Sequence, residues 1–241
     1  MYLTQFRFNT GRPEARRLLG SPHLMHGAVN MAFPELPDRE GQGPRVLWRV
    51  DRGRPQDRPE LFVVSPTRPD LTHLVEQAGW PTLDTPGWNT FAYGEFLDAL
   101  RKGDTWGFRL TANPVHNIRR PQDEKGARTR RAPHVTPRHQ LGWLIQRQQA
   151  AGFAVVEKPV ERRLTEHGDE YELIVRDYQP LQFRRAPAQR SVPDVRITRV
   201  TFDGRLTVTD PGLLRRTLTE GLGKAKAYGC GLMTLAPLGD R

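Results

Sequence analysis

Residues 2–31 read YLTQFRFNTGRPEARRLLGSPHLMHGAVNM, and their order of one strand and two helices sets the fold of the first half. Tyr2, Phe6 and Phe8 are separated by even steps, a spacing that is typical of a strand with one buried face. A short basic helix is predicted over 14–19, and the glycine that follows it is a common helix end.

A second helix is predicted to begin at Ser21 and Pro22. Serine caps the first turn of a helix, and proline fits the first helical position. His23 and His26 are three residues apart, so they lie side by side near the helix N-terminus, where a bound phosphate is favoured. The residues expected on its buried stripe are Leu24, Ala28 and Met31.

The elements predicted after this stretch complete a β-α-β-β-α-β order in the first half. Strands are predicted over 45–50, 60–65 and 105–112, with a helix over 70–80 and an irregular segment over 81–94. This order of elements is close to that of a ferredoxin-like fold.

The second half has a similar order of elements, although the two halves share no repeat at the level of sequence. A helix capped by Asp210 and Pro211 is expected to follow a hairpin that turns at Asp203-Gly204. The other elements predicted there are a helix over 137–151 and strands over 153–160, 170–178, 194–202, 205–209 and 232–236.

The charge of the chain favours a polyanionic partner. The 241 residues carry a formal net charge of +10, and 32 arginines outnumber 5 lysines. Arginine binds phosphate through a planar fork of donors and also stacks on bases. A GC-rich genome explains the arginine bias equally well, but it does not explain why acidic residues fail to balance the charge.

Residues 113–139 hold half of this excess charge, with seven basic residues against Asp123 and Glu124. Because the segment has little apolar content, we expect a mobile loop or linker. It is either a merely solvated linker or a basic loop that becomes ordered on RNA; its candidate RNA-binding residues are Arg128, Arg130 and Arg131.

Other features limit the class of protein. The single cysteine, Cys230, excludes an internal disulfide and a cysteine-rich metal site, and it fits a reducing cytoplasm. The N-terminus does not have the pattern of a signal peptide, and no stretch approaches the ~20 apolar residues of a membrane helix. We therefore expect a cytoplasmic protein with no membrane partner.

A glycine-rich segment near the C-terminus, GLGKAKAYGCGLMTLAPL at 221–238, is the most specific motif. It is neither a Walker loop nor a dinucleotide fingerprint. Glycines let a backbone approach a ligand closely, and lysines add charge, so the segment is a plausible cradle for a phosphate backbone. Its candidate RNA-binding residues are Gly221, Gly223, Lys224, Lys226, Gly229 and Gly231.

This segment, together with MYLTQFRFN at 1–9 and SPHLMHGAV at 21–29, resembles the CRISPR repeat-processing endoribonucleases of the CasE family in type I-E Cascade systems. The resemblance runs from end to end, with specific terminal motifs and a looser middle. It implies an α+β chain of two tandem ferredoxin-like (RRM-like) domains, 1–114 and 137–241, joined by a basic linker at 115–136.

The resemblance also implies a function. His26 matches the catalytic histidine of the family, with His23 as a second candidate, and Arg184-Arg185 resembles a segment that contacts the RNA hairpin. The family cleaves repeat RNA at the 3′ base of its hairpin, keeps the mature crRNA and joins other Cascade subunits. This chain departs from the family at His23, where members often have tyrosine, and at Met31, where some have lysine.

The expected chemistry needs no metal or cofactor, because RNA carries its own nucleophile. Attack of the 2′-hydroxyl on phosphorus gives a 2′,3′-cyclic phosphate and a 5′-hydroxyl. Histidine suits the proton transfers, since its pKa lies near neutrality, and lysines can stabilise the developing charge. The sequence leaves open whether His26 is the base or the acid.

Two other interpretations remain open at this point. The chain is either this endoribonuclease, a non-catalytic RNA-binding subunit of a similar fold, or a metal-dependent phosphoesterase. No Asp, Glu or Cys within four residues of the two histidines offers a further metal ligand, which weighs against a zinc site. The other histidines at 73, 116, 134, 139 and 167 show no grouping by sequence. Tyr228 and Phe183 either stack on bases or pack in the core.

Overall fold

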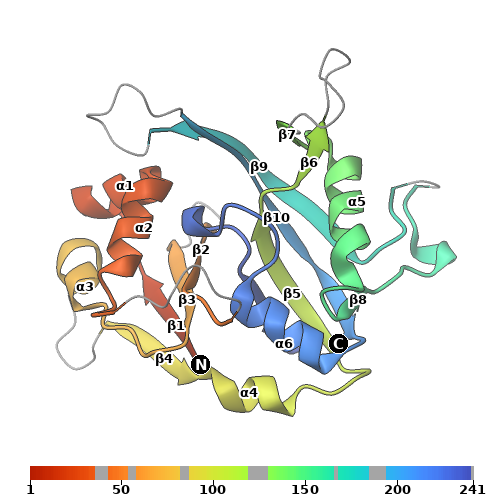
Figure 1. The fold of residues 1–241 in the computed structure, drawn as a ribbon, viewed down its shortest axis with the longest axis horizontal. Coiled ribbons are helices and arrows are strands. Elements are labelled where there is room, and N and C mark those ends of the chain that lie inside the picture. The colour runs from red at the N-terminus through yellow and green to blue at the C-terminus, as the bar shows by residue number, and fades with distance from the viewer. Residues whose placement is uncertain are drawn as a thin grey trace.

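The computed structural model describes residues 1–35, 43–53, 58–81, 87–118, 130–165, 168–184 and 194–239. The described residues form a mixed α/β structure with two larger antiparallel sheets, each packed against helices, and a separate two-stranded hairpin (Figure 1). None of the helices in these ranges is long and apolar enough to cross a membrane.

The first sheet has the strand order β2-β3-β1-β4. Its elements, in chain order, are β1 (Tyr2–Arg7), α1 (Pro13–Gly20), α2 (Pro22–Asn30), β2 (Leu47–Asp51), β3 (Glu60–Ser65), α3 (Thr72–Ala78) and β4 (Trp88–Ala92), followed by α4 (Tyr93–Ala99). The helices α1, α2 and α3 lie together on one side of this sheet (Figure 1). Their core contains Phe6, Phe8, Leu18, Met25 and Trp48.

The second sheet has the order β11-β5-β10-β8, and β9 pairs along β10. Its elements are β5 (Thr105–Ala112), α5 (Pro137–Gln148), β8 (Phe153–Val155), β9 (Leu173–Phe183), β10 (Val195–Val208), α6 (Pro211–Glu220) and β11 (Met233–Ala236), with the short 3-10 helices η1 (Val160–Arg162) and η2 (Lys226–Tyr228) between them. Without β9, the strand order repeats that of the first sheet.

The placement of residues 105–112 corrects the sequence analysis. We expected this strand to close the first sheet, but β5 is a central strand of the second sheet and pairs with both β10 and β11. Its buried residues Phe108, Leu110 and Ala112 pack in a core that contains Phe153 and Phe202. The edge beside β1 is taken instead by β4, within the segment 81–94 that we predicted to be irregular.

Two other expectations in the second half are wrong. Asp203-Gly204 is not a hairpin turn, because β10 runs straight through it and pairs both residues with β5. A β-carbon at Gly204 would lie 2.5 Å from the carbonyl oxygen of Glu172, so the glycine permits a close backbone approach instead. The strand expected over 153–160 ends at Val155.

The ends of the expected linker are ordered. β6 (Val115–Ile118) pairs with β7 (Arg130–Pro133) as an antiparallel hairpin, in which His116 faces Ala132. Both strands were expected to lie in an irregular segment. The intervening residues 119–129, among them Arg128, lie outside the described residues.

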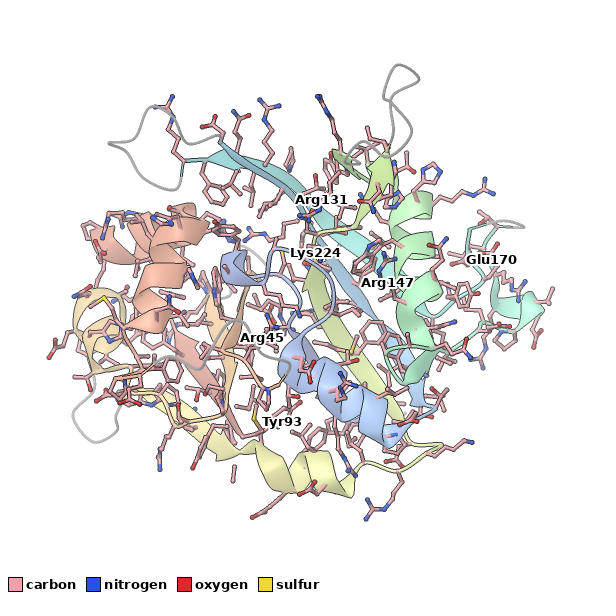
Figure 2. The ribbon with its side chains drawn as sticks, viewed as in Figure 1. Arg45, Tyr93, Arg131, Arg147, Glu170 and Lys224 are labelled. Carbon is pink, nitrogen blue, oxygen red and sulfur yellow. The ribbon has the colours of Figure 1, made fainter. Side chains whose placement is uncertain are left out.

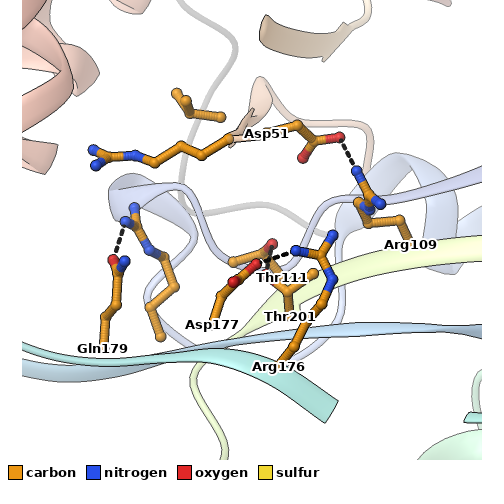
Figure 3. A pocket seen from close by; sticks show the side chains of 10 residues that line it. Asp51, Arg109, Thr111, Arg176, Asp177, Gln179 and Thr201 are labelled. Carbon is orange, nitrogen blue, oxygen red and sulfur yellow. Dashed lines mark hydrogen bonds and ion pairs between the residues drawn. The ribbon is translucent and has the colours of Figure 1, made fainter. Parts of the chain in front are cut away.

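An arginine-carboxylate network joins the two sheets. Arg49 of β2 pairs with Asp51 at 2.6 Å and donates to the carbonyl oxygen of Arg109 on β5 at 2.9 Å. Arg109 pairs with Asp51 at 3.1 Å and with Asp203 at 2.6 Å, and Arg176 of β9 also binds Asp203, at 2.7 Å. Burial alone would raise the pKa of Asp203, but these two arginines hold it below its ordinary value. This network borders a small cavity of about 50 Å³. Figure 3 shows the side chains that line it, among them Asp51, Arg109 and Arg176.

Candidate functional site

The helix that carries His26 begins at a well-formed cap and is anchored in the first core. The side chain of Ser21 accepts the backbone N–H of Leu24 at 3.3 Å, as the sequence predicted. α2 buries Met25, Ala28 and Val29. The cap and the buried residues therefore fix the position of the helix that carries His23 and His26.

His26 itself is half-buried in the middle of α2. One turn later, the side-chain amide nitrogen of Asn30 lies 3.3 Å from His26 Nε2. His23 lies one turn earlier on the same helix. Met31 follows the helix and is 69% exposed, which corrects its predicted place on the buried stripe.

The ring of Tyr228 packs on His26 from the glycine-rich segment. The two ring centroids are 6.5 Å apart and the ring planes meet at 65°. Phe183, the last residue of β9, packs on Tyr228 at 4.8 Å in an edge-to-face arrangement. Tyr228 is only 9% exposed. Protein neighbours therefore cover its ring, and an RNA base has little room to stack on it.

The glycines of this segment serve protein packing. All four adopt positive φ angles, at Gly221, Gly223, Gly229 and Gly231. A β-carbon at Gly229 would lie 2.6 Å from the ring of Trp48, and one at Gly221 would lie 2.8 Å from Leu47. Both clashes are with β2, so these glycines let the segment pack closely against the first sheet. The close packing of protein against protein that these glycines permit is different from the close approach of RNA that we predicted.

A basic groove lies beside Tyr228, bounded by the β9–β10 ribbon, the β6–β7 hairpin and the glycine-rich segment. Its volume is about 750 Å³, and Arg131, Arg196 and Lys224 line it together with Tyr178 and Tyr228. Among the described residues that line it, none is a carboxylate. Figure 2 shows Arg131 and Lys224 close together at the centre of this face. The groove is suited to bind a polyanion, and Tyr228 connects it to His26.

The two lysines of the segment have different surroundings. Lys224 is exposed and faces the groove. Lys226 donates from Nζ to the carbonyl oxygen of Glu220 at 2.6 Å, which satisfies the C-terminal end of α6. Burial lowers the pKa of Lys226, and the charges of Arg45 and Lys224 lower it further. Lys226 is thus placed as a cap for α6.

The arginines named from the sequence are distributed over two elements. Arg130 and Arg131 are exposed on β7, and Arg131 faces the groove. Arg184 follows Phe183 at the end of β9, is largely exposed, and lies 3.4 Å from Asp194. Arg128 and Arg185 lie outside the described residues.

Sequence reasoning missed a cluster of three histidines beside the hairpin. The ring centroids of His116 and His134 are 4.5 Å apart, and those of His134 and His139 are 6.0 Å apart. Burial lowers the pKa of His134, and the two neighbouring histidines contribute. Pairing of β6 with β7 brings His116 to His134 across the hairpin, a contact that no spacing in the sequence could have shown, and His139 joins them from α5. Within the described ranges, no group of three or more His, Cys, Asp or Glu residues is arranged to hold a metal ion.

Fold and site together define a class: a basic α/β protein of two similar sheets, with a histidine on a helix beside a basic groove whose described lining residues include no carboxylate. A scan against protein families matches residues 1–237 to the CRISPR associated protein family. The chain belongs to this family.

Individual relatives agree with this assignment. The chain is similar to the CRISPR-associated endoribonuclease Cse3 of Thermus thermophilus, with 30% identity over 237 residues that cover 98% of this chain and 100% of the relative. It is 29% identical to the CRISPR system Cascade subunit CasE of Escherichia coli K12 over 80% of this chain and 89% of the relative. A solved structure of Thermus thermophilus Cse3, bound to an RNA representing a pre-cleavage complex, has a TM-score of 0.73 at 29% identity and covers 98% of both chains.

Proposed function

We propose that this chain is an endoribonuclease that processes CRISPR repeat RNA. The observation that carries the proposal is the placement of His26 beside a basic groove with no carboxylate among its described lining residues. A similar protein is named a CRISPR-associated endoribonuclease, and its structure is known with a pre-cleavage RNA. We further propose that the chain cuts at the 3′ base of the repeat hairpin, keeps the mature crRNA and, like the CasE relative, joins other Cascade subunits.

The proposed reaction is a metal-independent transesterification. The 2′-hydroxyl attacks the adjacent phosphorus and leaves a 2′,3′-cyclic phosphate and a 5′-hydroxyl. His26 acts either as the base that takes the proton from the 2′-hydroxyl or as the acid that gives a proton to the leaving 5′-oxygen, and such a proton transfer is typically worth about 10²–10⁴ in rate. The N-terminal turn of α2 favours binding of the scissile phosphate, because a helix N-terminus attracts anions. Lys224 and Arg131, which face the groove, hold the RNA backbone.

We also propose that the chain consists of two ferredoxin-like units in tandem. Both sheets have the same strand order once β9 is set aside, and each unit runs β-α-β-β-α-β. Because β5 belongs to the second sheet, we place the boundary between α4 and β5 instead of at residue 114. The β6–β7 hairpin, expected as a linker, is then an insertion within the second unit.

A non-catalytic RNA-binding subunit is the second candidate function. It is favoured by Met31, an exposed apolar residue where some members of the family have lysine, and by His23 where tyrosine is common. In that case the groove would bind RNA, but no cleavage would follow.

We expect the chain to cleave a repeat RNA hairpin in excess EDTA, and a single 2′-deoxy substitution just 5′ of the scissile phosphate to stop the reaction. The deoxy substrate lacks the nucleophile, whereas chelation removes nothing that the proposed chemistry uses. Gel analysis of single-turnover reactions, with and without chelator, measures both effects.

A deoxy substitution two nucleotides away is the matched control and should be cut at the normal rate. Binding without any cleavage would favour the second candidate. Loss of activity in EDTA that a divalent ion restores would contradict the metal-independent reaction and point to a phosphoesterase.

RNA affinity should fall steeply with salt, because each phosphate contact releases counterions. We expect the double variant Arg131→Ala/Lys224→Ala to reduce the log–log salt slope by about 1.4–1.8 units, at roughly 0.7–0.9 per contact. Fluorescence anisotropy of the 2′-deoxy hairpin at several salt concentrations measures the slope.

The matched control is Lys102→Ala/Arg216→Ala, which removes the same charge from exposed positions outside the groove. Equal slopes for both double variants would remove the groove from the binding site.

A further inference from the structure

Packing around both residues supports the contact between Tyr228 and His26. Tyr228 is the last residue of η2. Ala225 and Gly229, which flank this short helix, both have the left-handed backbone conformation. A β-carbon at Gly229 would meet the ring of Trp48, which is 2% exposed, so this turn fits closely against the first core. The position of Tyr228 is therefore set by the packing of the glycine-rich segment.

Behind Tyr228 lies Phe183, whose ring contacts it at 4.8 Å. The aromatic row His26, Tyr228 and Phe183 thus runs from α2, through η2, to the end of β9. On its other side, His26 Nε2 meets the amide of Asn30 at 3.3 Å. A side-chain amide at one nitrogen and an aromatic ring against the imidazole together restrict how the imidazole can turn.

We propose that Tyr228 is a positioning residue, which holds the imidazole of His26 in the orientation that RNA cleavage needs. The inference rests on the proposed function in that His26 must act on RNA. The two nitrogens of an imidazole have different roles, and the one that faces the substrate is set by contacts at the ring. A displacement of about 1 Å at a reacting group can cost about 100-fold in rate.

The glycine-rich segment then has a role besides the proposed RNA binding. Its glycines let it pack on Trp48 and Leu47, and that packing brings Tyr228 to His26. Since the aromatic ring makes the contact with His26, phenylalanine at position 228 keeps this contact and leucine removes it.

The test compares Tyr228→Phe with Tyr228→Leu in the full chain. We expect the leucine variant to lose about tenfold or more in single-turnover cleavage rate, and the phenylalanine variant to stay within about threefold of the wild type. Both should bind the uncleavable 2′-deoxy hairpin with affinities within about twofold of the wild type, because both keep Arg131 and Lys224, the groove residues proposed to hold the RNA backbone. Tyr171→Leu is the matched control, since this half-buried tyrosine packs on the second core; its cleavage rate should be unchanged.

A second measurement needs no RNA. The ¹⁵N chemical shifts of the His26 imidazole, in protein labelled at histidine, report which nitrogen carries the proton. We expect wild type and Tyr228→Phe to share one distribution of tautomers, and Tyr228→Leu to move toward that of a solvated imidazole. If Tyr228→Leu does not fold, Phe183→Leu replaces it, because removing the ring behind Tyr228 should produce the same changes to a smaller degree.

The outcomes separate this inference from the proposed function. A wild-type protein that cuts no RNA refutes the proposed function, and the imidazole shifts still decide whether Tyr228 orients His26. If the wild type cuts and His26→Ala does not, equal rates and equal shifts in Tyr228→Leu and the wild type overturn the positioning role.

Discussion

Replacement of His26 by alanine should reduce cleavage of the repeat hairpin by at least 100-fold and leave RNA binding nearly unchanged. The imidazole is the proposed proton-transfer group, and such a group is typically worth about 10²–10⁴ in rate. The basic residues that line the groove remain in place, so the RNA backbone keeps its contacts. Single-turnover cleavage and anisotropy on the 2′-deoxy hairpin measure the two effects separately.

His23→Ala is the natural comparison, because it removes the same side chain one turn earlier on α2. We expect it to have a smaller effect on rate. A His26→Ala protein that cuts within about tenfold of the wild type would refute the assignment, because loss of a general acid or base should cost about 10²–10⁴ in rate. An equal loss in both variants would show that the two histidines act together.

Much of the first sheet and its helices could be predicted from local patterns. The strand at β1, the serine and proline that begin α2, and strands β2 and β3 follow from alternation and helix-start signals, and the structure confirms them. These signals are local, because each depends on residues within one turn or one strand.

The assignment of strands to sheets could not be predicted in this way. β5 alternates as a strand should, but its partners β10 and β11 lie about 90 or more residues further along the chain. The Asp203-Gly204 pair has the composition of a turn, yet β10 continues because Asp203 pairs with Arg109 and Arg176. Long-range pairing overrode local turn chemistry at this point.

The candidate site divides in the same way. The cap and the spacing of α2 indicated His26 from the sequence, whereas its contact with Tyr228 joins residues 202 positions apart. The groove residues Tyr178 and Arg196 were also missed, because they line the same groove only when β9 pairs with β10. Lys226 was named for its charge, but it donates a hydrogen bond to the carbonyl oxygen of Glu220 at the end of α6.

We expect Arg49→Met to lower the free energy of unfolding by roughly 3–5 kcal/mol, a large part of the ~5–15 kcal/mol typical of a folded protein. Arg49 is 1% exposed and pairs with Asp51 at 2.6 Å. Its guanidinium also donates to the carbonyl oxygen of Leu232 at 3.2 Å and to the hydroxyl of Thr234 at 2.8 Å, both near or on β11. Methionine fills similar volume but leaves these two acceptors without their donor, and it leaves Asp51 with Arg109 as its remaining arginine partner.

The loss at Arg49 should be visible in urea denaturation followed by circular dichroism, with Arg7→Met as the matched control. Arg7 also extends from a strand of the first sheet and pairs with a carboxylate, Glu60 at 2.9 Å, but its side chain is 58% exposed. An exposed pair is worth about 0–1 kcal/mol, so the control should unfold close to the wild type. If both variants lose the same small amount, the Arg49 network does not hold the two sheets together. A large loss at Arg49 alone shows that the buried arginine fixes the first sheet, and with it α2 and His26, against the sheet that lines the groove.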